Sequence, residues 1–293
     1  MKTDTLLDAV VVGGGPAGLA AGTHLSRAGR SALLLERGSL GGQARGLERI
    51  ENYPGFPGGI SGARLMELWL RQAERWGLAV RAGEVVSLAR GADGVFTVRL
   101  KKGRAVRSRS VLWCAGAGFL KLGVPGERRL LGKGVWNTYD EAPSCAGKSV
   151  AVIGSGEAAV QQAAILARKA KTVYLITRTP ALKAHNLLLE RLAGSGVVRL
   201  PGFRVSKIVG GKKLEAVELK PAAGRGQTKK IKTDALFTLI GKEPPGVPAA
   251  WLSKPAGFFE AGDCCSGRFR QVAVAGGDGI RAAMRCMIYL EDL

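Results

Sequence analysis

The hydrophobic pattern of the chain begins with an apolar, β-branched run at residues 9–12 that leads directly into a cluster of glycines. A stretch compatible with a helix follows at 17–28, and a second apolar run at 31–36 ends in the carboxylate of Glu36. This order predicts a strand, a helix and a second, parallel strand joined by a right-handed connection. The chain therefore opens with a βαβ unit.

The same order of apolar run, glycine turn and helix recurs in the second half of the chain. Residues 149–153 predict a strand, 160–169 a helix and 172–177 the next strand. Two such units in one sequence indicate two Rossmann-type nucleotide-binding domains.

Gly- and Pro-rich sequence over 38–59 predicts a loop, and Ser61 is placed to cap a helix at 62–76. Lys102-Gly103 predicts a hairpin turn between the last two strands of this region. The strands expected here are 80–87, 94–100 and 104–113.

The last third of the chain predicts a helix at 186–193, a β-meander, a strand entering a turn at 258–263, and a final helix at 272–290. The glycines at 276, 277 and 279 predict an interruption of that helix. The strands expected in the meander are 196–200, 205–209, 214–219 and 228–233, and residues 234–241 start the return to the first domain.

The glycine clusters carry the first chemical signal. Gly13, Gly15 and Gly18 fit the pattern G-x-G-x-x-G, in which the first glycine makes a tight turn and the second lets the backbone approach a diphosphate. The third allows the helix to pack closely on the strand. Glu36 lies about 20 residues further on, where an acid binds an adenosine ribose.

Composition excludes several classes of function. The 293 residues are 46% hydrophobic and 23% charged, no run of 18 apolar residues is present, and Asp4 and Asp8 argue against a signal peptide, so we expect a cytoplasmic protein. Five cysteines and two histidines, without a Cys-x-x-Cys, predict neither a disulfide framework nor a metal site.

The formal net charge of +21 predicts attraction to acidic partners or nucleic acid. The basic residues cluster around 99–109 and 207–232 without the interleaved aromatic residues that would stack on bases, so we do not expect nucleic-acid binding. An acidic partner protein stays open.

The ordered set of motifs resembles the low-molecular-weight thioredoxin reductases, two-domain flavoproteins of the pyridine nucleotide-disulfide oxidoreductase superfamily. The motifs that carry the resemblance are Gly13–Gly18, Gly41-Gly42-Gln43, Glu51-Asn52-Tyr53-Pro54-Gly55, Cys114–Ala117, Gly154–Ala159, Leu236–Gly241, Gly262-Asp263 and Arg270-Gln271-Val272. The resemblance implies an α/β fold of two Rossmann-like (three-layer ββα) domains, the second inserted into the first. The FAD-binding domain would comprise 1–118 and 240–293, and the NAD(P)H-binding domain 119–239. It also implies a homodimer.

The resemblance assigns residues to each cofactor and to no metal. The residues implied in FAD binding are Gly13, Gly15, Pro16, Ala17, Gly18, Glu36, Arg37, Gly42, Gln43, Asn52, Val86, Cys114, Ala115, Gly116, Gly262, Asp263, Arg270, Gln271 and Val272. Those implied in NAD(P)H binding are Gly154, Ser155, Gly156, Glu157, Ala158, Arg178, Ile240 and Gly241. One arginine, Arg178, stands where the family has a basic cluster, with Lys183 nearby, which favours NADPH over NADH.

The chain departs from the family where the redox dithiol belongs. Residues 136–142 read Trp-Asn-Thr-Tyr-Asp-Glu-Ala, so electrons cannot pass through a protein disulfide there. Candidate catalytic residues are Glu141, Cys264 and Cys265, against the alternatives of a cap for Glu141 and two reduced thiols facing different ways for the cysteines.

The sequence thus predicts an FAD-dependent NAD(P)H oxidoreductase that passes a hydride from NAD(P)H to FAD and on to an unidentified acceptor. A small disulfide, a quinone and an acidic, ferredoxin-like electron carrier are open. The alternative is a non-catalytic, flavin-binding redox sensor or scaffold.

Overall fold

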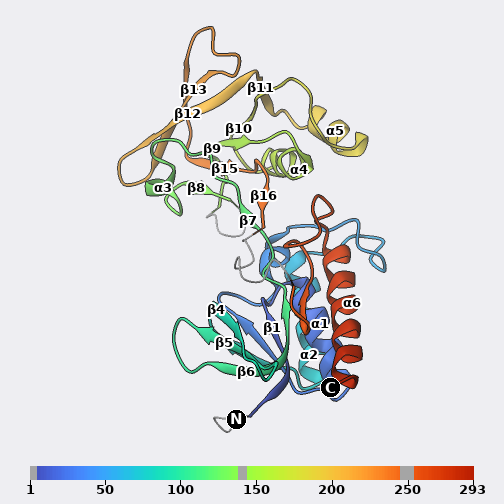
Figure 1. The fold of residues 1–293 in the computed structure, drawn as a ribbon. Helices are drawn as coiled ribbons and strands as arrows, with labels where there is room; N and C mark the ends of the chain where they lie inside the picture. Colours follow the sequence, from blue (N-terminus) through green and yellow to red (C-terminus); the bar gives the residue numbers. More distant parts are fainter. Residues whose placement is uncertain (1–4, 138–143, 245–253) are drawn as a thin grey trace. The chain divides into compact units, whose positions relative to one another are not determined.

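The computed structural model describes residues 5–137, 144–244 and 254–293, and the chain forms two compact units (Figure 1). The first unit contains residues 1–118 and 244–293, and the second contains residues 119–243. Within the described ranges, none of the helices has the length and apolar character needed to cross a bilayer.

A seven-stranded sheet forms the centre of the first unit. Six of its strands lie in the order β3-β2-β1-β6-β5-β4. The seventh strand, β17, is outside this order and pairs with β6. The pairs among β1, β2, β3, β6 and β17 are parallel, whereas β4, β5 and β6 form an antiparallel meander. The strands are β1 (Leu7–Val12), β2 (Ala32–Glu36), β3 (Ala79–Ala82), β4 (Val85–Arg90), β5 (Phe96–Leu100), β6 (Val106–Trp113) and β17 (Phe258–Glu260).

Both faces of β1 are buried, which explains its uninterrupted apolar sequence. Ala9 and Val11 belong to the core shared with the helices α1 (Pro16–Arg27), α2 (Gly62–Arg75) and α6 (Val272–Glu291). Val10 and Val12 belong to the core on the meander side. The alternation follows from the period of two along a strand.

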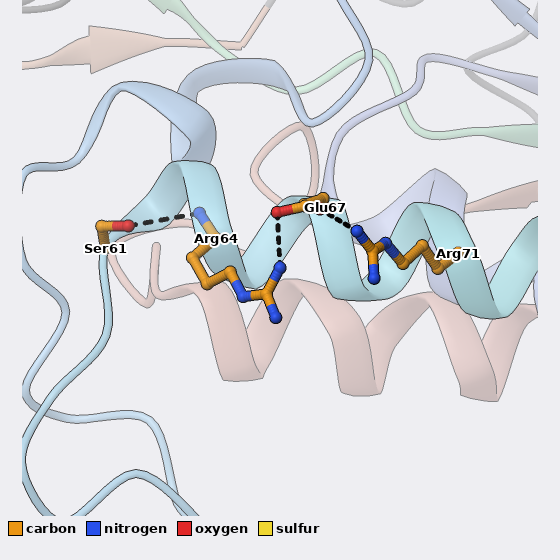
Figure 2. Close-up of polar contacts among 4 residues, drawn as sticks. All are labelled: Ser61, Arg64, Glu67 and Arg71. Carbon is orange, nitrogen blue, oxygen red and sulfur yellow. Dashed lines mark hydrogen bonds and ion pairs between the residues drawn. The ribbon is translucent and has the colours of Figure 1, made fainter.

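The start of α2 shows how local sequence sets a helix boundary (Figure 2). The Ser61 hydroxyl accepts a hydrogen bond of 3.2 Å from the Arg64 backbone N–H, which confirms the predicted cap. One turn on, Glu67 pairs with Arg64 at 2.7 Å and with Arg71 at 2.5 Å, and these contacts lower the pKa of the Glu67 carboxyl. Because all three side chains are exposed, these pairs add little to stability.

The second unit has a five-stranded parallel sheet in the order β11-β10-β9-β15-β8. A separate antiparallel sheet, β12-β13-β14, packs on a core shared with it. The strands of the second unit are β8 (Val135–Trp136), β9 (Ser149–Ile153), β10 (Thr172–Thr177), β11 (Val198–Pro201), β12 (Phe203–Gly210), β13 (Leu214–Pro221), β14 (Lys229–Lys232) and β15 (Ala235–Thr238). The helices are α3 (Glu127–Leu130), α4 (Glu157–Leu166) and α5 (Asn186–Ala193), and a two-stranded ribbon joins β7 (Gly118–Phe119) to β16 (Lys242–Glu243).

The α/β class with two Rossmann-like sheets is confirmed, but three local predictions are wrong. The expected strand 80–87 is two strands, β3 and β4, because the first pairs with β2 and the second with β5. The strand at 198–201 pairs in parallel with β10, so it belongs to the main sheet and not to the meander. The Gly-rich stretch after 38 contains a 3₁₀ helix, η1 (Gly42–Gly46).

The final helix is also continuous where an interruption was predicted. A Cβ built on Gly279 would lie 2.1 Å from the Ala17 carbonyl oxygen, and one on Gly276 would lie 2.7 Å from the Trp69 ring. The glycines therefore allow α6 to approach α1 and α2 closely. This packing outweighs a helix-propensity cost of about 1 kcal/mol per glycine.

Replacing Gly279 with alanine is expected to lower the free energy of unfolding by about 2 kcal/mol, because the new methyl group meets the α1 backbone. Gly277 is the matched control on the same helix, since a Cβ there meets no described atom within 4 Å. Gly277→Ala is expected to raise the free energy of unfolding by up to about 1 kcal/mol. Urea unfolding followed by circular dichroism measures both; equal effects of the two substitutions would contradict the packing argument.

Candidate functional site

The glycine turn after β1 is shaped by close backbone contacts. Gly13 has a φ of +105°, and a Cβ built on it would lie 2.2 Å from the Cys114 carbonyl oxygen at the end of β6. A Cβ on Gly18 would lie 1.8 Å from the Gly13 carbonyl oxygen. The first and third glycines are therefore required by the protein's own backbone.

Gly15 is different, because the fold itself leaves room beside it. A Cβ there would meet only the Gly42 Cα, at 4.0 Å, and its φ of −78° is open to any residue. Helix α1 begins at the next residue, Pro16, with no side-chain cap and no acidic residue in its first turn. Free space beside an uncapped helix N-terminus suits a diphosphate.

Glu36 lies beside this turn, at the end of β2. Its carboxylate accepts hydrogen bonds from the backbone N–H of Gly14 at 2.6 Å and of Gly38 at 2.7 Å. These two contacts hold the side chain against the glycine turn, which is the placement a ribose-binding acid needs.

Helix η1 brings Gln43 to the same turn. The Gly41 N–H bonds the Gly14 carbonyl at 2.8 Å, and Gln43 Nε2 donates to the Ala117 carbonyl at 2.5 Å. Gln43 Oε1 is buried and accepts no hydrogen bond from any residue in the described part of the chain. A buried acceptor without a donor is costly, so this oxygen fits a donor supplied by a ligand.

The start of α6 is tied to the loop that precedes α2. Asn52 Nδ2 donates to Gln271 Oε1 at 2.9 Å, and Gln271 precedes the first residue of α6 without capping it. Gly262, with a φ of +82°, packs against the start of α1, since a Cβ there would lie 2.7 Å from the Ala17 Cβ. Asp263 follows directly in the same turn.

The structure thus brings most of the predicted FAD residues to one end of the first unit's sheet. The contacts above join the glycine turn to Glu36, Gly42, Cys114 and Gly262, and Gln43 follows Gly42 in η1. Ala115 and Gly116 follow Cys114, and Arg270 and Val272 flank Gln271. Val86 and Arg37 are exposed and make none of these contacts; Val86 is skipped in the pairing of β4 with β5.

The predicted nicotinamide turn repeats this geometry within the second unit. A Cβ on Gly154 would lie 2.2 Å from the Leu239 carbonyl oxygen, whereas one on Gly156 would meet no described atom within 4 Å. Ala159 is fully buried at the third position. Helix α4 begins at Glu157, followed by Ala158, and has no side-chain cap.

Two basic residues, Arg178 and Lys183, follow the second strand of this βαβ unit. The Ser155 carbonyl accepts from the Lys183 N–H at 2.7 Å, and Arg178 is exposed just after β10. Gly241, with a φ of +123°, follows Ile240 and accepts from the Leu120 N–H at 3.0 Å. A guanidinium after the second strand suits a phosphate on the ribose.

The candidate catalytic residues occupy different environments. Cys264 is half-buried and Cys265 is exposed, and neither forms a disulfide. Cys114 is buried, and burial raises the pKa of its thiol, so it is inert as a nucleophile. Glu141 lies outside the described residues. No group of three or more potential metal-ligating side chains occurs within the ranges that the structure describes.

Some contacts of the site were not predicted. The carbonyl of Ala117 holds Gln43, and the N–H of Gly14 holds Glu36, although neither role was assigned. Asp278, within α6, accepts a hydrogen bond from Ser266 in the turn after β17. The sequence signal for Asp278 is an acidic residue in the first half of a helix whose other residues up to Ile280 are apolar or glycine.

The sequence matches the family model described as pyridine nucleotide-disulphide oxidoreductase over residues 7–250. It is 31% identical to a thioredoxin reductase of Bacillus subtilis over 100% of this chain and 98% of the relative, and 33% identical to one of Treponema pallidum over 100% and 99%. Among solved structures, the thioredoxin reductase of Lactococcus lactis matches with a TM-score of 0.90 and 26% identity, over 98% of this chain and 100% of that one.

Replacing Gly15 with alanine is expected to weaken dinucleotide binding at least about tenfold, because the methyl group takes space that the fold leaves open. The free energy of unfolding of the ligand-free protein should fall by less than about 1 kcal/mol, since the backbone conformation suits alanine. Gly13→Ala is the contrasting variant, because its φ and its contact with Cys114 predict a clear loss of stability. Flavin absorbance after reconstitution and urea unfolding separate the two effects; a Gly15→Ala protein that keeps full affinity would contradict the assignment.

Proposed function

The chain belongs to the pyridine nucleotide-disulphide oxidoreductase family, and on that premise we propose that it passes a hydride from NAD(P)H to FAD. The electrons then go to an acceptor, and this chain uses no Cys-x-x-Cys dithiol to deliver them. The resemblance to thioredoxin reductases makes it a flavoprotein oxidoreductase of that type. The observation that carries the rest is the pair of glycine turns, each with open space at its second glycine.

Residues 1–118 and 240–293 are proposed to bind FAD. Bound FAD supplies the redox chemistry, because its ring accepts two electrons as a hydride. The chain's part is to hold the FAD. The N-terminus of α1 stabilises the diphosphate, Glu36 accepts hydrogen bonds from ribose hydroxyls, and Gln43 Oε1 accepts a hydrogen bond from a donor group of the ligand. The uncapped start of α6 offers a second positive helix end to a negatively charged group.

Residues 119–239 are proposed to bind the nicotinamide nucleotide, with the diphosphate at the turn from Gly154 to Ala159. Arg178 follows the second strand of this βαβ unit, and Thr177, which ends that strand, carries no charge. A cation at this place attracts the 2′-phosphate of NADPH, whereas NADH recognition uses a carboxylate. We therefore propose NADPH as the preferred donor.

The lack of a Cys-x-x-Cys limits the kind of electron acceptor that this chain can use. The 293 residues contain no Cys-x-x-Cys, so the mixed-disulfide route between an internal dithiol and thioredoxin lacks its usual residues. The relatives are named thioredoxin reductases, and for this chain we instead propose a small disulfide, a quinone or an acidic electron-carrier protein as the acceptor. If the acceptor is a protein, the net charge of +21 favours an acidic one. A homodimer is proposed from the family resemblance.

A flavin-binding redox sensor without turnover is the second candidate. The observation in its favour is the same lack of a Cys-x-x-Cys dithiol in a chain that otherwise keeps both nucleotide turns. The two candidates differ in whether NAD(P)H reduces the flavin.

Anaerobic titration of the FAD-loaded protein with NADPH is expected to bleach the flavin absorbance completely, and more readily than titration with NADH. Turnover with a panel of disulfides, quinones and acidic electron carriers then identifies the acceptor class. A flavin that stays oxidised with either nucleotide would refute the oxidoreductase and leave the sensor.

Arg178→Ala is expected to raise the Kd for NADPH about tenfold, because it removes a charge-assisted contact with the 2′-phosphate. The Kd for NADH should stay the same, since NADH lacks that phosphate. Arg199→Ala is the control, because its guanidinium bonds the Pro180 carbonyl at 2.6 Å and is not proposed to touch the nucleotide. Calorimetric titration of both nucleotides measures the difference; equal losses for NADPH and NADH in Arg178→Ala would remove the assignment.

A further inference from the structure

Two adjacent thiols, Cys264 and Cys265, lie in the turn between β17 and α6. Cys264 Sγ is within 3.3 Å of the Trp113 carbonyl oxygen and 3.2 Å of the Ala261 carbonyl oxygen, and Cys265 Sγ is 3.4 Å from the Gly262 carbonyl oxygen. Cys264 is half-buried and Cys265 is exposed. The pair therefore has one shielded member and one that solvent and solutes can reach.

The turn that carries the thiols is held in place. The Gly262 carbonyl accepts from the N–H of Cys265 at 2.9 Å, from the N–H of Ser266 at 3.0 Å and from the Ser266 hydroxyl at 2.8 Å. Gly262 itself packs on Ala17 at the start of α1. The thiols thus follow directly on a segment that contacts the glycine turn of the first unit.

The two thiols differ in acidity for a physical reason. The pKa of Cys265 is lowered by its interaction with the Cys264 side chain, and the positive charge of Lys254 acts in the same direction. Burial, Asp278 and Glu260 oppose these effects but do not reverse them. The pKa of Cys264 is raised by its interaction with Cys265 and by burial. An exposed thiol with a lowered pKa, next to a half-buried thiol with a raised pKa, is the arrangement of an attacking and a resolving cysteine.

We propose that Cys264 and Cys265 form a redox-active pair that reduces a low-molecular-weight disulfide, with Cys265 as the attacking thiol and Cys264 as the resolving thiol. This inference rests on the proposed function, because NAD(P)H supplies the electrons for repeated turnover. It deepens that function by choosing the small disulfide among the open acceptors.

The exchange takes place in two displacements. The Cys265 thiolate forms a bond to one sulfur of the disulfide, and the other sulfur leaves as a thiolate that takes up a proton from water. Cys264 then releases its proton and attacks Cys265 Sγ, so the second substrate sulfur leaves and is protonated. Two electrons pass from the pair to the substrate, two thiols are released, and Cys264 and Cys265 are left joined. With NAD(P)H and FAD bound, one hydride equivalent from NAD(P)H and one proton from water would restore the two thiols.

The bond between adjacent cysteines closes a small ring that strains the intervening peptide. Strained disulfides have higher reduction potentials and belong to the labile, catalytic class. The oxidised pair is therefore expected to be reduced readily and not to persist.

The test uses the full-length, reduced protein without nucleotide, with hydroxyethyl disulfide as the substrate. Free thiols are alkylated under denaturing conditions before digestion. Mass spectrometry is then expected to show Cys264 joined to Cys265, with Cys114, Cys145 and Cys286 alkylated and without a mixed disulfide, as internal controls. These three are buried, and burial raises the pKa of Cys286 to about 11. Cys265 should react at least about tenfold faster than any of them.

Variants separate the two roles. Cys264→Ser and Cys264→Ala should both hold a stable mixed disulfide on Cys265, whereas Cys265→Ser should form none on Cys264. Circular dichroism of each variant shows whether it is folded. A wild-type protein in which the two cysteines are never joined, or a mixed disulfide found on Cys264 instead, would overturn the proposal.

This outcome is independent of the proposed oxidoreductase function. Bleaching of the flavin by NADPH in the absence of any disulfide reports only on hydride transfer. Exchange in the absence of nucleotide reports only on the thiol pair. Bleaching without exchange would refute the pair, and exchange without bleaching would refute the NAD(P)H oxidoreductase.

Discussion

The close backbone approach at the start of α1 is the constraint on which the first unit depends. Gly18 lies against the Gly13 carbonyl, and Gly13 lies against the carbonyl of Cys114, the residue after β6, so α1, β1 and β6 converge without room for a methyl group. Gly262 and Gly279 also pack against Ala17 in the first turn of α1. With the backbone of α1 held from both sides, the one open position is Gly15, and the helix N-terminus faces that opening.

The second unit meets the same constraint with different residues. Gly154 contacts the carbonyl of Leu239 at the end of β15, and Ala159 takes the place that Gly18 has in the first unit. A buried methyl group is tolerated there, so the third position asks only for a small side chain. The second glycine stays open in both turns, which separates a requirement of the fold from a requirement of the ligand.

Much of the fold could be predicted because its signals are local. The strands at 149–153 and 172–177, the helix at 186–193 and the Ser61 cap depend on apolar periodicity and capping chemistry within a few residues. The continuity of α6 could not be predicted, because the partners that require its glycines, Ala17 and Trp69, come from distant parts of the chain. The pairing of β11 with β10 likewise depends on sheet order, which the sequence of β11 does not contain.

The candidate site divides in the same way. The glycine turns and Glu36 follow from spacing along the sequence. The Gln43 Oε1 atom, which has no hydrogen-bond partner among the described residues, and the contact of Gly14 with Glu36 arise only when η1 and β2 meet the turn. Local patterns therefore locate the proposed site, and long-range contacts determine which atoms line it.

Glu36 is the last residue of β2, Arg178 follows the corresponding strand β10, and the two residues carry opposite charges. Two turns of nearly the same backbone would otherwise compete for the same nucleotides. A carboxylate held by two backbone N–H groups repels a phosphorylated ribose, whereas an exposed guanidinium attracts one. On the proposed assignment, a single charge at each turn sorts two similar cofactors between two similar sites, so that neither occupies the place of the other.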